Sequence, residues 1–276
     1  MSVSVVIPVH NGAKYLAEAI ESAYAQTRSP DEVIVVDDGS TDRTAELVRE
    51  FANRPGFCAV RKVQGGEASA RNAGVTRARG EYVAFLDHDD VWHPAKLERQ
   101  LSEFESGWGM SFTAHTVTSP DESRVERYES WDAEAAAVRR LLEHSPPLWP
   151  SSAALVRRDL LQRIGPFQQI KPFGDDWLMW LRIVAAGNGV GYTGEPLTQY
   201  RWHGDNLSKD DAGFYEAACG VFDAYGDSRL RTEWRLRAAS AARARQDLTL
   251  ARRRVVQAAR IRPWAIRPGW VRLMMG

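Results

Sequence analysis

Three carboxylates stand within four positions at Asp87-His88-Asp89-Asp90, directly after the strand-like run Glu81–Leu86. This run has the β-branched and aromatic content of a buried strand, and unpaired carboxylates are strongly disfavoured inside one. The acidic residues are therefore expected at the exit of the strand, on a surface where a positive group neutralises them. Mg²⁺ and Mn²⁺ prefer oxygen ligands and are often shared with substrate phosphates. The cluster predicts a metal–diphosphate site.

Two more polar clusters follow strand-like runs earlier in the chain. Asn11-Gly12 comes after Val3–Val9, and Asp37-Asp38-Gly39-Ser40 closes a run that begins at Glu32. In parallel sheets, ligands bind outside the carboxyl ends of the strands. The three clusters are therefore expected along one edge of one sheet.

The first part of the chain alternates strand-like and helix-like segments. Strands are predicted over 3–9, 32–37, 57–63 and 81–86, and helices over 13–26, 41–51, 67–77 and 94–104. Ser40 or Thr41 is expected to cap the second helix, and Asp90 the segment after Trp92. The alternation predicts an α/β fold with a Rossmann-like, mainly parallel sheet flanked by helices.

The pattern is less regular from Gly109 onward. Strands are predicted over 112–117, 153–157 and 198–202, helices over 133–143 and 177–186, and a loop over the proline-rich segment 146–150. After Asp211 the chain is expected to be helical, with arginines around one apolar stripe. The stripe consists of Leu230, Trp234, Ala238, Ala241, Leu248, Ala251, Val255 and Ala258.

The bulk composition is that of a globular protein. Of the 276 residues, 44% are hydrophobic and 26% charged, and no apolar run is long enough to span a membrane. The sequence contains no secretory signal. The spacing of Cys58 and Cys219 does not match that of metal-binding or redox-active cysteines, so both are expected to be reduced, which favours a cytoplasmic location. The net charge of zero hides an asymmetry, because residues 229–276 carry 13 arginines against two acidic residues, a local charge of +11. An acidic body with a basic tail is a signal about partners.

Six short motifs, taken in order, resemble glycosyltransferase family 2. They are Val3–Gly12, Val35–Asp42, Ala70–Gly74, Phe85–Trp92, Gly174–Trp177 and Tyr200–His203. The match covers roughly residues 2–208 and implies an inverting enzyme that uses nucleotide sugars and has the GT-A fold. It implies a catalytic domain over 1–210, with a nucleotide-binding half over 1–105 and an acceptor half over 106–210. Residues 211–276 would then form a basic helical C-terminal extension.

The resemblance implies that the nucleotide contacts Pro8, Asp37, Asp38, Arg71 and Asp87. A carboxylate can accept a hydrogen bond from a base N–H such as N3 of uracil, and the family pattern makes Asp38 the base contact. A UDP-sugar is the favoured donor. Helix capping is the structural alternative for the Asp37-Asp38 pair. Bracing of the acidic loop is the alternative for Arg71.

The resemblance also assigns the metal. Asp87 and Asp89 stand at the family's Asp-x-Asp element, and alternate residues of an extended segment point the same way. Asp89 is the implied direct ligand of Mn²⁺ or Mg²⁺, and Asp87 a ribose or water-mediated contact. His203 matches a position that can approach the metal or diphosphate, although a lone histidine is usually structural. Arg201 could pair with phosphate.

Asp176 is the candidate general base, because inverting transfer needs a carboxylate that removes the proton of the attacking hydroxyl. The family usually has Glu-Asp here, so Asp175 departs from the pattern and its supporting role is open. Capping of the following helix is the structural alternative. Trp177 is an acceptor candidate, since sugar rings stack on indoles, and so are Trp149, Trp180 and Trp202. The spacing of Trp177 and Trp180 also fits core packing.

Other function classes are weaker. Nucleotidyl transfer would need a Gly-rich basic phosphate loop, and 10–14 is a poor version of one. A non-catalytic module could use the arginine-rich tail on anionic membranes or nucleic acid, which would leave the carboxylates unexplained; no nucleic acid is expected as a partner. The tail itself could contact the inner face of a membrane or cover the catalytic domain, and its alanine-rich stripe favours the cover. The acceptor could be a glycan, a lipid-linked sugar, a peptide or a small molecule.

Overall fold

The chain folds into two compact units. The computed structural model describes residues 1–119, 123–126, 150–171, 173–204, 206, 211–266 and 268–270. One unit comprises Met1–Gln168 with Met179–His203, and the other Gln169–Leu178 with Gly204–Gly276. The predicted helix 133–143 and most of the predicted loop 146–150 lie outside the described residues.

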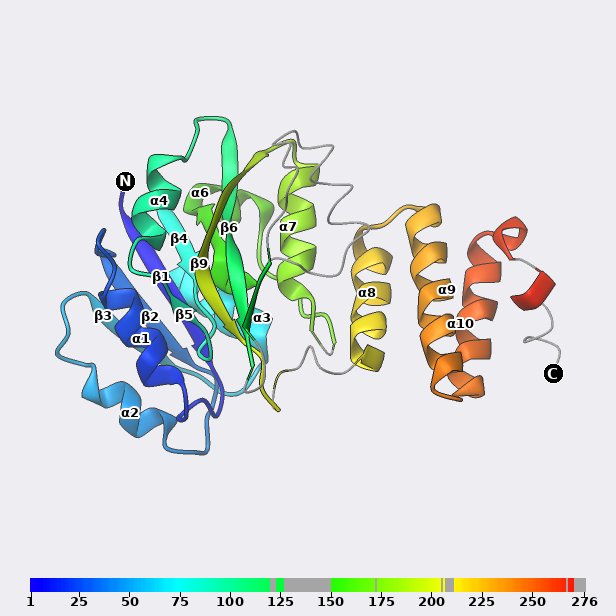
Figure 1. Cartoon of the computed structure of the whole chain (residues 1–276), viewed down its shortest axis with the longest axis horizontal. Helices are drawn as coiled ribbons and strands as arrows, with labels where there is room; N and C mark the ends of the chain where they lie inside the picture. The colour runs from blue at the N-terminus through cyan, green and yellow to red at the C-terminus, as the bar shows by residue number, and fades with distance from the viewer. Residues whose placement is uncertain are drawn as a thin grey trace. The chain divides into compact units, whose positions relative to one another are not determined.

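The first unit is built on one sheet (Figure 1). Its strands are β1 (Val3–Val9), β2 (Glu32–Asp37), β3 (Phe57–Arg61), β4 (Tyr82–Phe85), β5 (Val91–Trp92), β6 (Trp108–Thr118), β7 (Ser123–Glu126), β8 (Ala154–Arg157) and β9 (Gly189–Arg201). The sheet order is β3-β2-β1-β4-β8-β6-β9-β5, and β7 pairs with β6. β1 to β4 are parallel, as predicted, whereas β8 joins β4 and β6 in antiparallel fashion. The α/β fold is confirmed, with a mixed second half.

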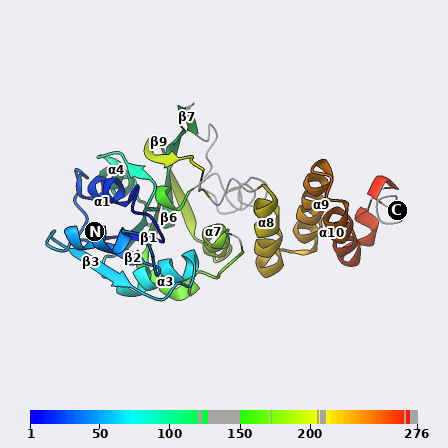
Figure 2. The same cartoon turned by 90° about the horizontal axis from the view of Figure 1, so that it is seen from below.

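Helices cover both faces of this sheet. The helices are α1 (Leu16–Tyr24), α2 (Thr44–Glu50), α3 (Glu67–Arg77), α4 (Lys96–Ser102), α6 (Arg158–Ile164) and α7 (Asp175–Ala185), and α7 continues from the second unit into the first. Figures 1 and 2 show α1 and α4 on one face and α3 and α7 on the other. The apolar side chains of β1 at alternate positions pack with α1 and α4, and Val6 points at Gly74 of α3. Alternation along β1 thus fills both cores.

Strands β1 and β4 separate at Pro8. Their pairing ends at Val6 and Phe85, and the last ladder bond runs from the Leu86 N–H to the Val6 carbonyl. In a parallel ladder the next bond would be donated by the N–H of residue 8 to the Leu86 carbonyl. Proline has no N–H, so this bond cannot form. The chain after Leu86 therefore leaves the sheet between two strands whose connections lead in opposite directions, the place where such folds bind ligands.

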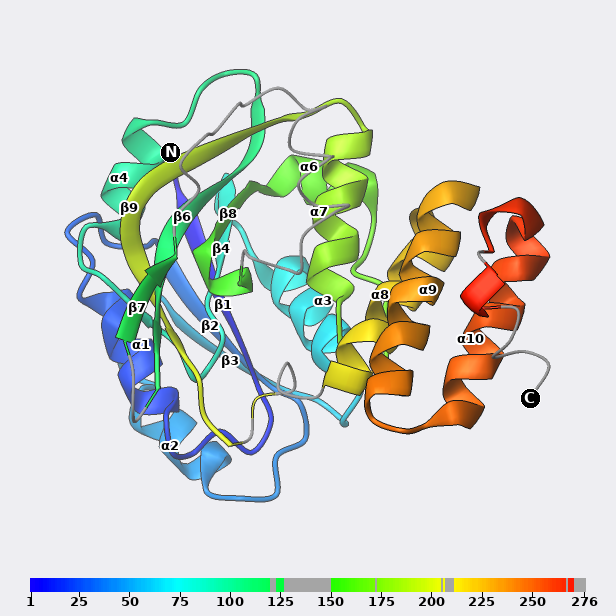
Figure 3. The same ribbon diagram turned by 45° about the vertical axis from the view of Figure 1, so that its right-hand side comes forward.

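The second unit has its own aromatic core. Its helices are α8 (Asp211–Tyr225), α9 (Ser228–Ala244), α10 (Leu248–Ile261) and the 3-10 turn η3 (Pro263–Ala265) (Figure 3). Trp177 packs edge-on against Trp234 and Phe222 at centroid distances of 5.5 Å and stacks with Phe214 at 6.2 Å. Trp177 and Trp234 are both 1% exposed. These rings hold the segment 169–178 in the helical unit.

Two of the tail's arginines are buried within that unit. Arg235 of α9 donates two hydrogen bonds to Asp223 of α8, and Arg254 of α10 pairs with Glu216 of α8. Both arginines are 6% exposed. These two arginines, which are not part of the predicted apolar stripe, are therefore buried by ion pairs within the unit. Leu248, predicted within the stripe, is 47% exposed. No helix in the described part of the chain is long and apolar enough to cross a membrane.

Candidate active site

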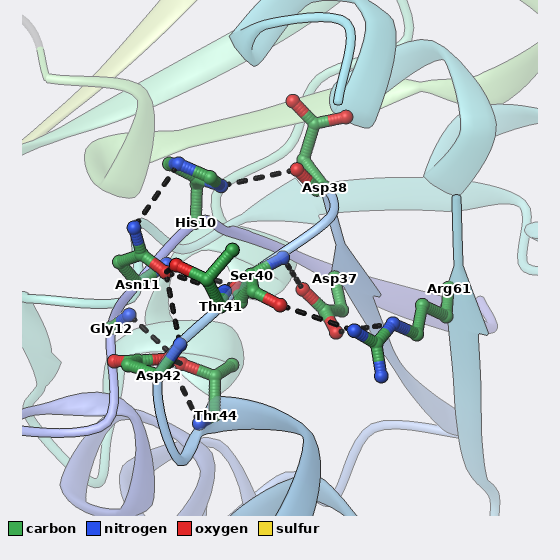
Figure 4. A network of polar contacts seen from close by, with 10 residues as sticks. All are labelled: His10, Asn11, Gly12, Asp37, Asp38, Ser40, Thr41, Asp42, Thr44 and Arg61. Carbon is green, nitrogen blue, oxygen red and sulfur yellow. Dashed lines mark hydrogen bonds and ion pairs between the residues drawn. The ribbon is translucent and has the colours of Figure 1, made fainter. Parts of the chain in front are cut away.

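Two loops at the carboxyl edge of β1 and β2 are joined by hydrogen bonds (Figure 4). The Asn11 Oδ1 accepts the N–H groups of Thr41 and Asp42, and the Asn11 N–H donates to Ser40 Oγ at 2.9 Å. Asn11 has φ = 52°, a left-handed conformation that asparagine tolerates better than most residues. The Asp42 Oδ1 accepts the N–H of Thr44 at 2.9 Å. The two polar clusters predicted at this edge do lie together.

The predicted caps of α2 are wrong. This helix begins at Thr44, and its N-cap residue Arg43 makes no side-chain capping bond. The hydroxyl of Ser40 and the N–H of Thr41 instead bond to Asn11. The two residues predicted to cap α2 therefore form hydrogen bonds with Asn11 in the neighbouring loop.

The carboxylates of Asp37 and Asp38 are buried at the end of β2, at 3% and 2% exposure. Asp37 accepts the N–H of Ser40 at 2.8 Å and lies 3.4 Å from Arg61 Nε. Asp38 accepts hydrogen bonds from Lys62 Nζ at 2.5 Å and from the N–H groups of Gly65 and Gly66. Burial by itself would raise the pKa of Asp38, but these hydrogen bonds outweigh it and the pKa is lowered. Asp38 is therefore ionised at neutral pH.

Arg71 and Asp87 form a partly buried pair. Arg71 belongs to α3 and its side chain is 4% exposed, whereas that of Asp87 is 24% exposed. The Arg71 Nη2 donates to Asp87 Oδ1 at 3.0 Å, and Nη1 lies 3.4 Å from Glu67. The pair fixes the first carboxylate of the acidic loop. Pro8, the remaining predicted nucleotide residue, lies buried near the end of β1.

Asp89 and His203 meet although they are 114 positions apart. The His203 Nε2 lies 3.0 Å from Asp89 Oδ2, and the two side chains are 14% and 16% exposed. The imidazole ring packs on Tyr15 at a centroid distance of 4.8 Å. Arg201 lies over the same Tyr15 ring at 5.2 Å and pairs with Glu18 at 2.6 Å. Asp89, the second aspartate of the acidic loop, is therefore held near residues from the end of β9 and the start of α1.

Asp90 is a buried structural group. It is completely buried, and its carboxylate accepts bonds from the Ser152 hydroxyl and from the Arg201 N–H at 3.0 Å. Burial, followed by the charges of Asp89 and Asp87, holds the pKa of Asp90 well above its usual range. The predicted helix-capping role is wrong, because α4 begins only at Lys96. Asp90 instead connects the acidic loop to β9.

Asp175 and Asp176 form the first turn of α7. Asp175 is 1% exposed, and the Asp176 carboxylate accepts the N–H of Trp177 at 2.7 Å. Gly174 precedes them with φ = 110°, a conformation that favours glycine. Of these residues Asp176 is the more accessible acid. Both acids belong to the segment that packs with the C-terminal helices.

The tryptophans considered as acceptor contacts differ in how exposed their side chains are. Trp177 is enclosed by aromatic rings, so its predicted contact with a sugar acceptor is wrong for this structure. Trp180 is also 1% exposed and packs on Phe85 and Phe112. Trp202 is half-buried beside Tyr200 at a centroid distance of 6.3 Å and is the one partly open tryptophan among the three candidates that the structure describes. Trp149 lies outside the described residues.

The Asp89–His203 pair is compatible with a divalent ion. Ligands about 2.1 Å from an ion in octahedral geometry are separated by about 3 Å along an edge, close to the observed distance. Among the described residues, no group of three or more His, Cys, Asp or Glu side chains is gathered for a metal. If the pair held an ion, substrate oxygens would have to supply further ligands. Sharing an ion with substrate phosphates is usual for Mg²⁺, whose protein ligands are usually carboxylates and not imidazole.

The model of glycosyl transferase family 2 matches residues 4–165. The chain belongs to this family. An uncharacterised glycosyltransferase of Rickettsia prowazekii is 31% identical over 212 residues, covering 73% of this chain and 64% of that protein. One of Nostoc is 29% identical over 218 residues, covering 75% and 66%. The matches span less than two thirds of these two relatives.

Solved structures share the fold with this family 2 chain. The S. aureus protein TarS 1–349, in complex with UDP-GlcNAc, has a TM-score of 0.71 at 19% identity, covering 95% of this chain and 83% of that one. The mannosyltransferase PcManGT of Pyrobaculum calidifontis, in complex with GDP-Man and Mn²⁺, has a TM-score of 0.62 at 20% identity, covering 99% and 83%. The GT-A fold is confirmed by this likeness.

Sequence reasoning missed two residues that organise the site. Lys62 pairs with Asp38, and Ser152 bonds to both Asp87 and Asp90. Lys62 lies within the predicted strand 57–63 but directly after the observed strand β3, which ends at Arg61. Ser152 stands in no motif, and only the folded chain brings it to the acidic loop.

Proposed function

We propose that this chain is an inverting, metal-dependent transferase that moves a sugar from a nucleoside diphosphate donor to an acceptor hydroxyl in glycan, polysaccharide or glycoconjugate synthesis. The observation that carries the proposal is the meeting of Asp89 with His203 beside the Arg71–Asp87 pair, where β1 and β4 separate. Glycosylation of a peptide or small natural product is the alternative for the same site.

A UDP-sugar is the favoured donor. TarS was solved with UDP and with UDP-GlcNAc, and PcManGT with GDP-Man, so a nucleoside diphosphate suits this fold. Asp38 would accept the base N–H. An ionised carboxylate offers about four acceptor positions, and Lys62, Gly66 and a Gly65 N–H shared by both oxygens fill those of Asp38, so the base N–H would replace one of these bonds. Pro8, Asp37, Arg71 and Asp87 would complete the nucleotide site.

Asp89 and His203 would hold the divalent ion, Mn²⁺ or Mg²⁺. When bound, such an ion supplies charge that stabilises the departing diphosphate. Arg71 orients Asp87, and Arg201 lies close enough to His203 to share one aromatic neighbour with it. Arg201 would pair with the diphosphate, adding a fixed positive charge.

Asp176 would be the general base. Its carboxylate takes the proton of the acceptor hydroxyl while the oxygen forms the new bond to the anomeric carbon and the diphosphate leaves. Asp175, fully covered, would position this turn and have no contact with substrate. We place the enzyme in the cytoplasm, because Cys58 and Cys219 are both free thiols.

The metal assignment is tested by Asp89→Asn. Thermal stabilisation by UDP with Mn²⁺, and metal-dependent hydrolysis of UDP-sugars, should both be lost, because a bound ligand raises apparent stability by mass action. Asp159→Asn, an exposed acid on α6, is the control and should behave as wild type. Wild-type hydrolysis by Asp89→Asn would show the metal site to be elsewhere.

The base is tested by Asp176→Asn. Donor affinity should change little, while transfer should fall about 10²–10⁴-fold, the usual contribution of a general base. Glu195→Gln, a half-exposed acid on β9, serves as the control. If Asp176→Asn turns over normally, another group removes the proton.

A further inference from the structure

One row of side chains along α10 alternates in character. Every fourth residue from Leu248 belongs to it: Leu248, Arg252, Val256, Arg260 and, in η3, Trp264. We call these five residues the outer α10 row. Leu248 is 47%, Val256 37% and Trp264 76% exposed. Exposed large apolar side chains thus alternate along this row with two arginines, of which Arg260 is exposed and Arg252 is half-buried.

The opposite side of α10 already has its partners. Ala251, Val255 and Ala258 are completely buried, and α10 packs along α9 (Figure 3). Arg254 is buried and pairs with Glu216 of α8. The three-helix unit is therefore held by one side of α10, and the outer α10 row contributes little to that packing.

The charge along this row is predominantly positive. From Leu248 to Gly276 the sequence contains seven arginines and no acidic residue. Arg253 is exposed, and the Arg262 guanidinium lies 5.7 Å from the centre of the Trp264 ring. A surface that fits this face must therefore be anionic.

We infer that the outer α10 row docks on the surface of a bilayer that contains anionic phospholipids. Arginines meet the lipid phosphates, while Leu248, Val256 and Trp264 enter the boundary between headgroups and acyl chains. Tryptophan favours this boundary because its ring is amphipathic. A nucleic acid would use the arginines but would leave the interspersed apolar side chains in water. This membrane contact is independent of the transfer reaction.

Vesicle binding by the full chain tests the inference. The protein should sediment with vesicles of phosphatidylcholine and about 30% phosphatidylglycerol, and not with phosphatidylcholine alone. The triple variant Arg253→Gln, Arg260→Gln, Arg262→Gln should bind about 100-fold more weakly, given about 1 kcal/mol for each basic residue at the surface. The matched control Arg43→Gln, Arg49→Gln, Arg229→Gln removes three exposed arginines elsewhere and should bind as wild type.

A second variant tests the apolar part of the contact. Trp264→Ser should weaken vesicle binding several-fold and leave circular dichroism unchanged, because Trp264 is exposed. Equal loss in the matched control, equal binding to neutral vesicles, or no binding at all would overturn the inference. A nucleic-acid surface would also overturn the inference. It would be indicated if single-stranded DNA displaced the protein from vesicles and if the Trp264→Ser variant bound that DNA as tightly as wild type.

Discussion

At the scale of single residues, one hydroxyl fixes the acidic loop. Ser152 lies in the 3-10 turn Ser151–Ala153 and is completely buried. Its Oγ accepts the Asp87 N–H at 2.9 Å and donates to the Asp90 carboxylate. Its carbonyl accepts the Trp92 indole N–H at 2.7 Å. Because the loop's two ends converge on Ser152, the position of Asp89 between them depends on this serine.

Ser152→Ala should destabilise the protein by about 1–3 kcal/mol, because it leaves a buried carboxylate and a buried N–H short of a partner. Urea unfolding measures the loss. Donor binding should weaken as well, since Asp87 and Asp89 are no longer held. Ser102→Ala, which removes an exposed hydroxyl on α4, is the control. Unchanged stability would mean that water or another group replaces the hydroxyl.

Lys96 gives a prediction about pH. It is completely buried, with Nζ 2.6 Å from Gln100 Oε1 and 4.3 Å from the centre of the Trp92 ring. Burial lowers the pKa of Lys96 well below its usual value. Between the lowered pKa and about 10.4, the value in the unfolded chain, the unfolded state binds more protons, so stability rises with pH.

Lys96→Met removes this dependence. The variant should be more stable than wild type by about 1–3 kcal/mol at low pH, where the wild type buries an ammonium group. The difference should close as the pH approaches about 10. Urea unfolding at several pH values measures it, with the exposed Lys171→Met as control. A constant difference across this range would contradict the assigned protonation.

At the scale of elements, the sequence predicted the first half well because local signals and packing agree there. Helix α3 occupies the predicted residues 67–77, and the parallel strands lie within one or two residues of their predicted ends. β9 was predicted only over 198–202 but begins at Gly189. Its glycines and Pro196 look like a loop, and pairing with β6 overrides that preference, with register shifts beside Pro196.

The acidic residues of the candidate site could be predicted from the sequence, whereas most of the residues that bond to them could not. Acids that follow strands must lie at the sheet edge, so Asp38, Asp87 and Asp89 could be identified from the sequence. Helical spacing does not tell which side of α7 faces a core, so the sequence left both acceptor contact and core packing open for Trp177. The contacts of Ser152 depend on pairing between distant strands, which no local pattern encodes.

Gly174→Ala tests whether the backbone conformation of Gly174 is needed to begin α7 at Asp175. Its φ of 110° is strained for alanine, while the added Cβ would only reach ordinary contact with Val221 at 3.4 Å. The expected loss is about 1–2 kcal/mol in thermal or urea unfolding, with lower transfer because Asp175 and Asp176 follow directly. Gly107→Ala, with open space and no such φ, should be neutral. Equal behaviour of both would exclude backbone strain at Gly174.

At the scale of the whole molecule, each unit has a core of its own. The first unit packs Trp180 on Phe85 and Phe112, and the second packs Trp234 with Trp177 and Phe222. The charge asymmetry of the sequence is partly used inside the second unit, where Asp223 and Glu216 pair with buried arginines. Stability is therefore expected to respond to core mutations unit by unit.

Trp234→Ala should destabilise the second unit by about 3–5 kcal/mol. Hydrogen exchange should become faster in α8, α9, α10 and residues 173–178, while β1, β2 and β4 keep their protection. UDP binding should persist, because the proposed nucleotide residues belong to the first unit. Loss of protection throughout the chain would show that the two cores unfold as one.

The missing N–H of Pro8 has a consequence for how this edge can change during evolution. Almost any other residue at position 8 would restore a donor facing the Leu86 carbonyl, and a further ladder bond could then draw the chain at 87 and 88 into the sheet. No side chain of the loop would be altered, yet its carboxylates would point differently. A substitution there could abolish ligand binding in a protein that folds more stably than its parent, a loss that a screen for stability would score as an improvement.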